Sequence, residues 1–374
     1  MAKAKKSKIL KESALRKKWA DSNIAANVVL GIDEMLWLPS RILALNDLMG
    51  GGIPFGKIIE IFGLESSGKS LIANDFAYTA QQLGGVVLWN DAESSFTKHW
   101  AELNGLDLER VELFPEKSIE LISDWSADMI RYYRGQLTKN EPILLVIDSI
   151  ASLDCLSNLD LEQTDRKAEM GNRAKAMDLF LRTRNRFFSE MGVCVILINQ
   201  VRSKIGASKF ESPFTTPGGH AAAFYASIRL GIYGGKQLKQ KIGSKEYRVG
   251  RVTTIRVEKN KVAAPKPSLK SVPVYFDPQD DTPVGFDRYF GLPEILERNK
   301  VVKRKTGSSS YYLEDKLIAR GEESLIKLLK EDDKLRAKLI RKAGINTVRN
   351  TQRKIKGIKE NLFNYGNSEQ NEEE

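Results

Sequence analysis

A glycine-rich segment in the first quarter of the chain has the spacing G-x-x-x-x-G-K-S and could bind a phosphate chain. Backbone N–H groups at the start of a helix favour anions, and glycines let the loop approach a phosphate closely. Lys69 can reach the β- and γ-phosphates of a nucleoside triphosphate, and the Ser70 hydroxyl can bind Mg²⁺. The predicted nucleotide-binding residues are Gly63, Leu64, Glu65, Ser66, Ser67, Gly68, Lys69 and Ser70. The alternative is a glycine turn with a helix-capping serine.

Three more polar residues stand where apolar runs end. In open α/β sheets, ligands bind at the carboxyl ends of the strands. Asp148 closes the run 142–147 and could hold Mg²⁺ directly or through water. Glu93 follows the run 86–90 and could orient or deprotonate the water that attacks the γ-phosphate. Gln200 could sense that phosphate and transmit the state to the loop that follows it.

Each of these three residues also has an ordinary structural interpretation. Asp148 could cap a strand or a helix, Glu93 could be a surface acid, and Gln200 could be a passive buried amide. The sequence alone leaves these alternatives open.

The elements that position these residues alternate between strands and helices. Buried strands are predicted at 58–62, 86–90, 142–149 and 193–200, with helices starting at 71 and spanning 97–104, 118–134 and 172–191. Continuously apolar strands with helices between them are typical of a mostly parallel sheet that is covered on both faces. The predicted fold class is therefore α/β.

In the second half of the chain, the predicted secondary structure changes twice. Strands near 227–233 and 249–259, rich in glycine and lysine around their connection, predict a basic hairpin, and a further strand follows near 272–276. Past Pro283, short helical pieces surround a small hairpin of 301–303 and 310–313. The predicted parts are an N-terminal basic helix and linker for oligomerisation (1–35), a core with polar loops at 156–171 and 201–219 (36–282), a small α+β domain (283–346), and a basic segment with an acidic tail (347–374).

The composition limits the class of protein. Of the 374 residues, 41% are hydrophobic and 29% are charged, and no apolar run approaches the roughly 20 residues of a membrane-spanning helix. The two cysteines are expected to be buried free thiols, which predicts a cytoplasmic protein, and two histidines argue against a histidine-based zinc site. The net charge of +11 suggests a polyanionic partner; the alternative is a solvated basic surface.

Five further segments are distinctive in their order and spacing: Asp-Ala-Glu at 91–93, Leu-Val-Ile-Asp-Ser-Ile-Ala-Ser-Leu at 145–153, Ile-Asn-Gln-Val-Arg-Ser-Lys-Ile-Gly at 198–206, Thr-Thr-Pro-Gly-Gly at 215–219 and Lys-Asn-Lys-Val-Ala-Ala-Pro at 259–265. With the glycine-rich segment, they make the chain resemble the RecA family of strand-exchange recombinases, bacterial or phage-encoded, over about residues 36–345. The resemblance implies a RecA-type P-loop ATPase core. It also implies filaments on single-stranded DNA, strand exchange with double-stranded DNA, and hydrolysis of ATP with Mg²⁺.

By the same resemblance, ATP lies between neighbouring subunits of a helical filament. Glu93 is then the catalytic carboxylate, and Lys259 and Lys261 reach the γ-phosphate of the adjacent protomer, as an arginine finger would. Thr97 and Trp100 take part in nucleotide binding, with Trp100 stacked on adenine. Without the resemblance, the two lysines would be solvated charges and Trp100 a core aromatic residue.

The two polar loops match the DNA-binding loops of that family. Cations and backbone N–H groups can grip phosphates, while apolar side chains such as Ile205 or Met170 can wedge between bases. The matching residues are Met170, Gly171, Lys175, Arg182, Arg202, Ile205, Gly218, Gly219 and His220. Because Gln200 precedes the second loop, ATP state and DNA grip are expected to be linked.

Two other functions share part of this pattern. A hexameric RecA-fold motor or helicase would have the same P-loop and sheet, and a binding protein could use ATP only as a structural switch. The paired lysines at 259 and 261 and the glycine pair at 218–219 favour the recombinase.

Overall fold

The computed structural model describes residues 35–159, 169–203, 214–215, 220–242, 244–264, 266–276, 284–305 and 307–356. The chain divides into two compact units, residues 1–36 and 37–374, and every element below belongs to the second. The predicted N-terminal helix lies outside the described residues. Among the described helices, none is long and apolar enough to cross a membrane.

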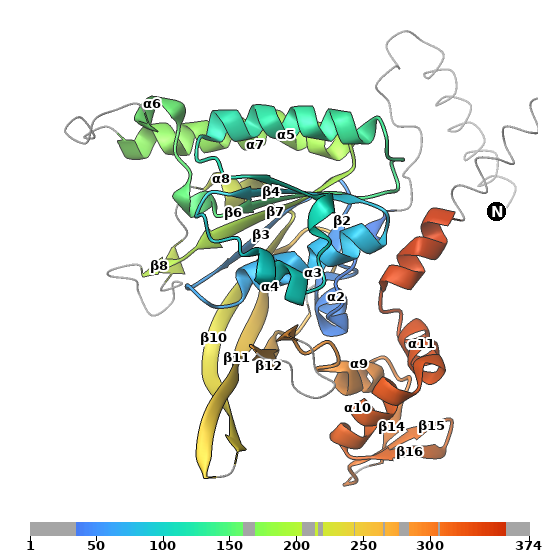
Figure 1. The fold of residues 1–374 in the computed structure, drawn as a ribbon. Coiled ribbons are helices and arrows are strands. Elements are labelled where there is room, and N and C mark those ends of the chain that lie inside the picture. The colour runs from blue at the N-terminus through green and yellow to red at the C-terminus, as the bar shows by residue number, and fades with distance from the viewer. Residues whose placement is uncertain are drawn as a thin grey trace, which may run out of the picture. The chain divides into compact units, whose positions relative to one another are not determined.

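A nine-stranded mixed sheet forms the centre of this unit (Figure 1), in the order β13-β12-β11-β10-β3-β7-β6-β4-β5. The strands from β10 to β5 run parallel to their neighbours: β3 (Ile58–Gly63), β4 (Val86–Asp91), β5 (Val111–Phe114), β6 (Ile143–Asp148), β7 (Val193–Gln200) and β10 (Ile228–Ile242). Antiparallel strands continue the sheet as β11 (Lys245–Asn260), β12 (Leu269–Tyr275) and β13 (Gly285–Phe286). The mostly parallel α/β fold predicted from the sequence is confirmed.

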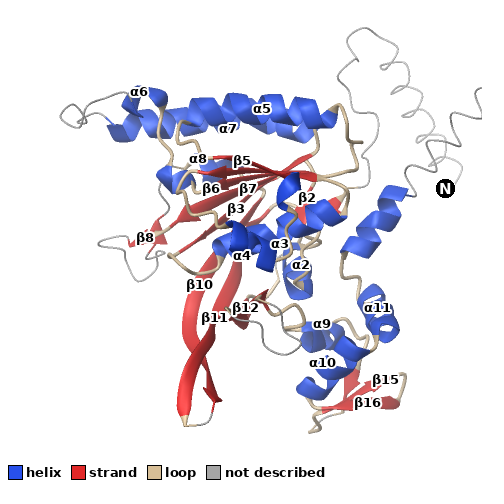
Figure 2. Cartoon of the chain, viewed as in Figure 1, coloured by secondary structure: helices blue, strands red, loops and turns tan. Residues whose placement is uncertain are grey.

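Helices cover both faces of this sheet (Figure 2). On one face, α5 (Ile119–Arg134) packs against α7 (Glu169–Glu190), and both contribute to a core that includes Ile122 and Phe180. On the other face lies α3 (Lys69–Gln82), which follows β3 directly. The remaining helices of this region are α2 (Leu43–Met49), α4 (Lys98–Leu103), α6 (Leu156–Leu159) and α8 (Ala221–Tyr225).

The first polar loop is more helical than predicted. Residues 156–159 form α6, and α7 begins at Glu169 instead of 172. Asp154 stabilises the start of α6, because its Oδ1 accepts hydrogen bonds from Cys155 N and from Asn158 Nδ2, both at 2.8 Å. A polar residue that caps a short helix is easily mistaken for a loop residue.

The predicted basic hairpin is confirmed, but it is longer than expected. Strands β10 and β11 pair from Ile228 and Asn260 out to Ile242 and Lys245, and Figure 1 shows them projecting beyond the rest of the sheet. The sequence places the turn too early because of the glycines near 234. Those glycines instead sit at a β-bulge, between the pairs Gly234–Thr253 and Gln237–Arg251.

The C-terminal region has its own hydrophobic cluster, formed around Leu292, Leu325 and Leu339. The sequence predicts a two-stranded hairpin here, but the structure has a three-stranded sheet. The additional strand, at 316–320, was not predicted. The chain reverses through Glu314 and Asp315, both at positive φ, and polar residues in such a turn hide the strand behind it. The elements are α9 (Leu292–Arg298), β14 (Lys303–Arg304), β15 (Ser310–Leu313), β16 (Lys316–Arg320), α10 (Glu322–Glu331), α11 (Asp333–Lys342) and a helix at 348–356.

Candidate functional site

The glycine-rich loop connects the end of β3 to the start of α3, as the sequence predicts. Gly68, at the N-cap of α3, has φ 102°, a conformation that favours glycine. At Gly63, a Cβ would lie 2.2 Å from the carbonyl oxygen of Ile232, so only glycine fits between β3 and β10. The two glycines therefore serve different purposes: one allows the turn and the other allows close packing.

The Lys69 side chain turns back onto its own loop. Its Nζ donates hydrogen bonds to the carbonyl oxygens of Gly63 at 3.1 Å and of Leu64 at 2.8 Å. Burial lowers the pKa of this ammonium, while the nearby carboxylates, Asp148 first, act in the opposite direction. A bound phosphate would offer the lysine stronger, charged acceptors than these carbonyl groups.

Ser70 and Asp148 lie together beside the loop. Ser70 Oγ donates to Asp148 Oδ2 at 2.8 Å. Burial raises the pKa of Asp148 to about 6, against the opposing effect of this hydrogen bond. No cluster of three or more acidic, histidine or cysteine ligands occurs among the described residues. A hydroxyl and one carboxylate suit Mg²⁺, which commonly takes few protein ligands and completes its shell with phosphate oxygens and water.

The side chain of Glu93, which follows β4, forms hydrogen bonds with residues at the ends of β6 and β7. Its Oε1 accepts hydrogen bonds from Gln200 Nε2 at 2.8 Å, from Ser152 Oγ at 3.0 Å and from Ser149 Oγ. Asp91 shapes the loop that carries Glu93, because its carboxylate accepts from the backbone of residues 95 and 96. The predicted catalytic carboxylate and the predicted sensor amide are therefore in direct contact.

A cavity of about 410 Å³ opens beside the P-loop, and two arginines from β11 line it together with Trp100. Arg251 donates from Nη1 to the carbonyl oxygen of Ser66, and Arg248 lies 5.0 Å from the centroid of the Phe276 ring. The sequence did not point to these arginines, because their approach to the P-loop depends on the pairing of β10 with β3.

Thr97 lies at the start of the helix that carries Trp100, and its predicted role in nucleotide binding stays a prediction. It is the N-cap of α4, the helix that carries Trp100, and its Oγ1 donates to the carbonyl oxygen of Ser95 at 3.4 Å. It is not among the residues that line the cavity. Its side chain forms no capping hydrogen bond with α4.

Lys259 and Lys261 lie toward the opposite end of β3 from the P-loop. In the sheet, Lys259 lies opposite Arg229 of β10, and Arg229 lies opposite Glu60 of β3. Glu60 is three residues before Gly63, or about 10 Å along the strand. Lys259 Nζ donates to the carbonyl oxygens of residues 223 and 224, at 2.6 and 2.9 Å. Burial, and then the neighbouring Lys261, lower the pKa of Lys259. Within one protomer, the structure does not bring these lysines to Lys69.

Comparison with known proteins identifies the family. The model of the RecA N-terminal domain matches residues 32–276. Protein RecA of Rubrobacter xylanophilus is 35% identical over 300 residues, which cover 80% of each chain. Protein RecA of Chloroherpeton thalassium is 34% identical over 310 residues, covering 82% of this chain and 80% of the relative. The chromosomal RecA of Lactococcus lactis is 32% identical over 294 residues, covering 78% and 71%.

The chain belongs to the RecA family. It is a RecA-type recombination protein and a DNA-dependent ATPase, as the sequence predicts. RecA proteins bind ATP and DNA and form filaments, and nothing in the comparisons favours the hexameric motor.

Some of the predicted DNA-binding positions of this RecA-family chain lie within the described residues. Gly171, Lys175 and Arg182 are exposed on α7, with the two cations seven residues apart and thus on the same side of the helix. His220 is exposed at the N-cap of α8. The backbones of Met170, in α7, and Arg202, in the short strand β8 (Arg202–Ser203), are described without their side chains, while Ile205, Gly218 and Gly219 lie outside the described residues.

Proposed function

We propose that this RecA-family protein polymerises as a helical filament on single-stranded DNA, holds ATP between neighbouring protomers, and exchanges the bound strand with a homologous duplex. The observation that carries the proposal is the hydrogen bond from Gln200 to Glu93. It connects the carboxylate of the ATP site to the residue that opens the loop 201–219. A change at the γ-phosphate would therefore alter the start of a DNA-binding loop.

In this proposal each cis residue of the nucleotide site has a separate task. Lys69 exchanges its contacts with the loop carbonyls for the β- and γ-phosphates. Ser70 and Asp148 hold Mg²⁺, which supplies charge neutralisation on the phosphates when it is bound. Glu93 orients the attacking water and accepts its proton, while Ser149 and Ser152 fix the carboxylate.

Lys259 and Lys261 would act on the ATP of the adjacent protomer. Their distance along the sheet from their own P-loop supports this assignment, because they cannot complete the site in cis without rearrangement. Two cations brought to the γ-phosphate would stabilise negative charge in the transition state only after the subunits associate. ATP hydrolysis would then depend on filament formation.

DNA binding would be shared between separate parts of the chain. We assign the grip on the single strand to the core 36–282, through the segments 156–171 and 201–219, with Lys175 and Arg182 contacting phosphates. The region 1–35 would mediate oligomerisation, 283–346 would gather duplex DNA, and 347–374 would be a basic segment with an acidic tail.

The test is a strand-exchange reaction between a labelled duplex and a homologous single strand. Joint molecules should form with ATP and Mg²⁺, but not without the nucleotide or with Lys69→Ala. The matched control is Lys57→Ala, which removes a lysine just before β3 and should exchange normally. Exchange that proceeds equally well without ATP, or rings as the sole assembly in electron micrographs, would refute the proposal.

A further inference from the structure

A second cavity, of about 540 Å³, shares no lining residue with the cavity beside the P-loop. Four segments that are distant in sequence form it: residues 40–43 before and at the start of α2, residues 288–289 before α9, helix α11, and the helix at 348–356. We call it the cationic cavity. The nucleotide site includes none of its lining residues, whereas Arg288, Tyr289 and α11 belong to the region 283–346 that we assign above to duplex DNA.

Positive charge dominates the lining of the cationic cavity. Five exposed cations from α11 and the helix at 348–356 contribute: Lys334, Lys338, Arg341, Arg349 and Arg353. Arg41, Arg288 and Arg336 add three more, and Asp333 is the single acidic residue of the lining. The eight cations thus outnumber the acids eight to one.

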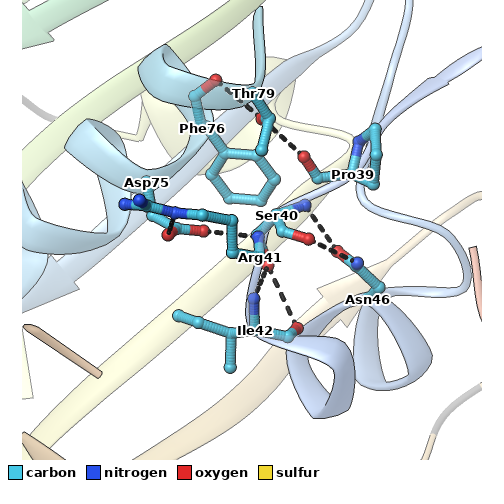
Figure 3. A network of polar contacts seen from close by, with 8 residues as sticks. All are labelled: Pro39, Ser40, Arg41, Ile42, Asn46, Asp75, Phe76 and Thr79. Carbon is cyan, nitrogen blue, oxygen red and sulfur yellow. Dashed lines mark hydrogen bonds and ion pairs between the residues drawn. The ribbon is translucent and has the colours of Figure 1, made fainter. Parts of the chain in front are cut away.

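Few of these charges are neutralised within the described part of the chain. Arg41 pairs with Asp75 at 2.6 Å, in the network of Figure 3 that fastens residues 39–46 to α3. Arg336 pairs with Asp333 at 2.5 Å. The five exposed cations form no ion pair with any described residue, and Arg288 has its pKa lowered by burial and by the neighbouring Arg41. The cavity therefore retains an uncompensated positive field that favours an anionic ligand.

The apolar part of the lining distinguishes between kinds of anion. Leu43, Ala337, Ile340 and Val348 contribute aliphatic surface, which a phosphate backbone cannot use. Sites for single-stranded nucleic acid add exposed aromatic rings for base stacking. Here the single aromatic lining residue, Tyr289, already has Lys330 and Arg336 at 5.7 Å from its ring centroid. A ligand with both carboxylates and aliphatic side chains fits this lining better than DNA does.

The spacing of the cations indicates an extended ligand. Lys334, Lys338 and Arg341 follow one side of α11 over about 10 Å, and Arg349 and Arg353 are one helical turn apart. An extended peptide places every second side chain about 7 Å farther along, close to one helical turn. We propose that the cationic cavity binds an extended acidic segment of a partner protein, in which carboxylates alternate with aliphatic residues.

The proposal is tested with the full-length protein and a fluorescent peptide in which aspartate alternates with leucine. Fluorescence anisotropy in the absence of ATP and DNA should show saturable binding. Replacing aspartate with asparagine in the probe should abolish binding, and replacing leucine with serine should weaken it. The double substitutions Lys334→Glu with Lys338→Glu, and Arg349→Glu with Arg353→Glu, should each weaken binding by at least about tenfold.

A matched control keeps the net charge equal. Lys300→Glu with Lys316→Glu reverses two exposed lysines of the same region that do not line the cavity, and it should change the affinity by less than about twofold. The two test pairs lie on different helices, so thermal unfolding curves of each variant identify a folding defect without removing the other test.

Four results would overturn the proposal. The first is absence of binding to the intact protein, and the second is an equal loss of affinity in the control variant. The third is a DNA probe, single-stranded or duplex, that displaces the peptide and loses as much affinity from the same substitutions, which would make this a nucleic-acid site. The fourth is peptide binding that requires Glu372→Gln, Glu373→Gln and Glu374→Gln, which would assign the cavity to the chain's own acidic end.

Discussion

Two of the three donors to the Glu93 carboxylate have separable roles. Ser152 and Gln200 both donate to its Oε1, at 3.0 and 2.8 Å, but only Gln200 leads directly into the loop 201–219. Removing either donor disturbs the orientation of the carboxylate. Removing Gln200 also removes the connection to the loop, so the two substitutions distinguish positioning from communication.

We expect Gln200→Ala to reduce the stimulation of ATP hydrolysis by single-stranded DNA about tenfold, with little change in ATP affinity, because a coupling of one to a few kcal/mol is lost. Ser152→Ala is the control and should retain most of the stimulation. Steady-state hydrolysis with and without DNA provides the measurement. Equal loss of stimulation in both variants would assign Gln200 a positioning role only.

Arg251 is a residue that the sequence did not reveal. Its guanidinium donates to the carbonyl oxygen of Ser66, which has φ 53°, and Thr253 Oγ1 approaches the next carbonyl oxygen at 3.5 Å. Lys69 and Ser70, in contrast, are identified by the spacing of one local motif. A contact between residues 185 positions apart follows from strand order, which local patterns do not specify.

Arg251→Ala should therefore weaken ATP binding about tenfold, since the P-loop loses a charged hydrogen bond that holds its backbone. Arg256→Ala is the matched control, because Arg256 lies on the same strand and does not line the cavity. Titration with a fluorescent ATP analogue measures both affinities. The same affinity in the two variants would show that Arg251 does not support the loop.

At the level of elements, β3, the P-loop and α3 form the part of the fold that the sequence predicts best. The strand is apolar except for Glu60, the loop has its glycines, and the helix follows at once, so all the information is local. The hairpin β10–β11 was underestimated because its glycines form a bulge instead of a turn. Local patterns thus predict that elements exist, but not how far pairing extends them.

Gly63→Ala tests the contact between β3 and β10. The added Cβ would lie 2.2 Å from the carbonyl oxygen of Ile232, which should lower the free energy of unfolding by at least about 2 kcal/mol. Gly171→Ala is the control: nothing lies within 4 Å of its Cβ position, and alanine in a helix should raise stability by up to about 1 kcal/mol. Urea unfolding followed by circular dichroism measures both, and an unchanged midpoint for Gly63→Ala would contradict the contact.

For the whole molecule, the division of the proposed catalytic groups matters most. Glu93, Lys69 and Asp148 gather at the carboxyl ends of the parallel strands, whereas Lys259 and Lys261 lie toward the other end of β3. The sequence could supply the identity of both sets through family resemblance. It could not show that one protomer keeps them apart, because that depends on the order of the strands.

Mixing experiments test whether the two sets meet across subunits. A Lys69→Ala protein and a Lys259→Ala, Lys261→Ala protein should each be nearly inactive as ATPases. A random equal mixture on single-stranded DNA should recover up to about a quarter of the wild-type rate, because that share of head-to-tail contacts joins two intact halves. A mixture no more active than its components would exclude catalysis in trans.

The self-contained bonding of Lys69 also bears on how the enzyme resets after each round of hydrolysis. Because the carbonyl oxygens of Gly63 and Leu64 can accept its hydrogen bonds, the ammonium keeps hydrogen-bond partners after the nucleotide leaves. Dissociation of ADP therefore does not leave a buried ammonium without hydrogen bonds, which lowers the free-energy cost of product release. In the proposed filament, the lysine therefore needs no movement of a neighbouring protomer to regain its hydrogen bonds.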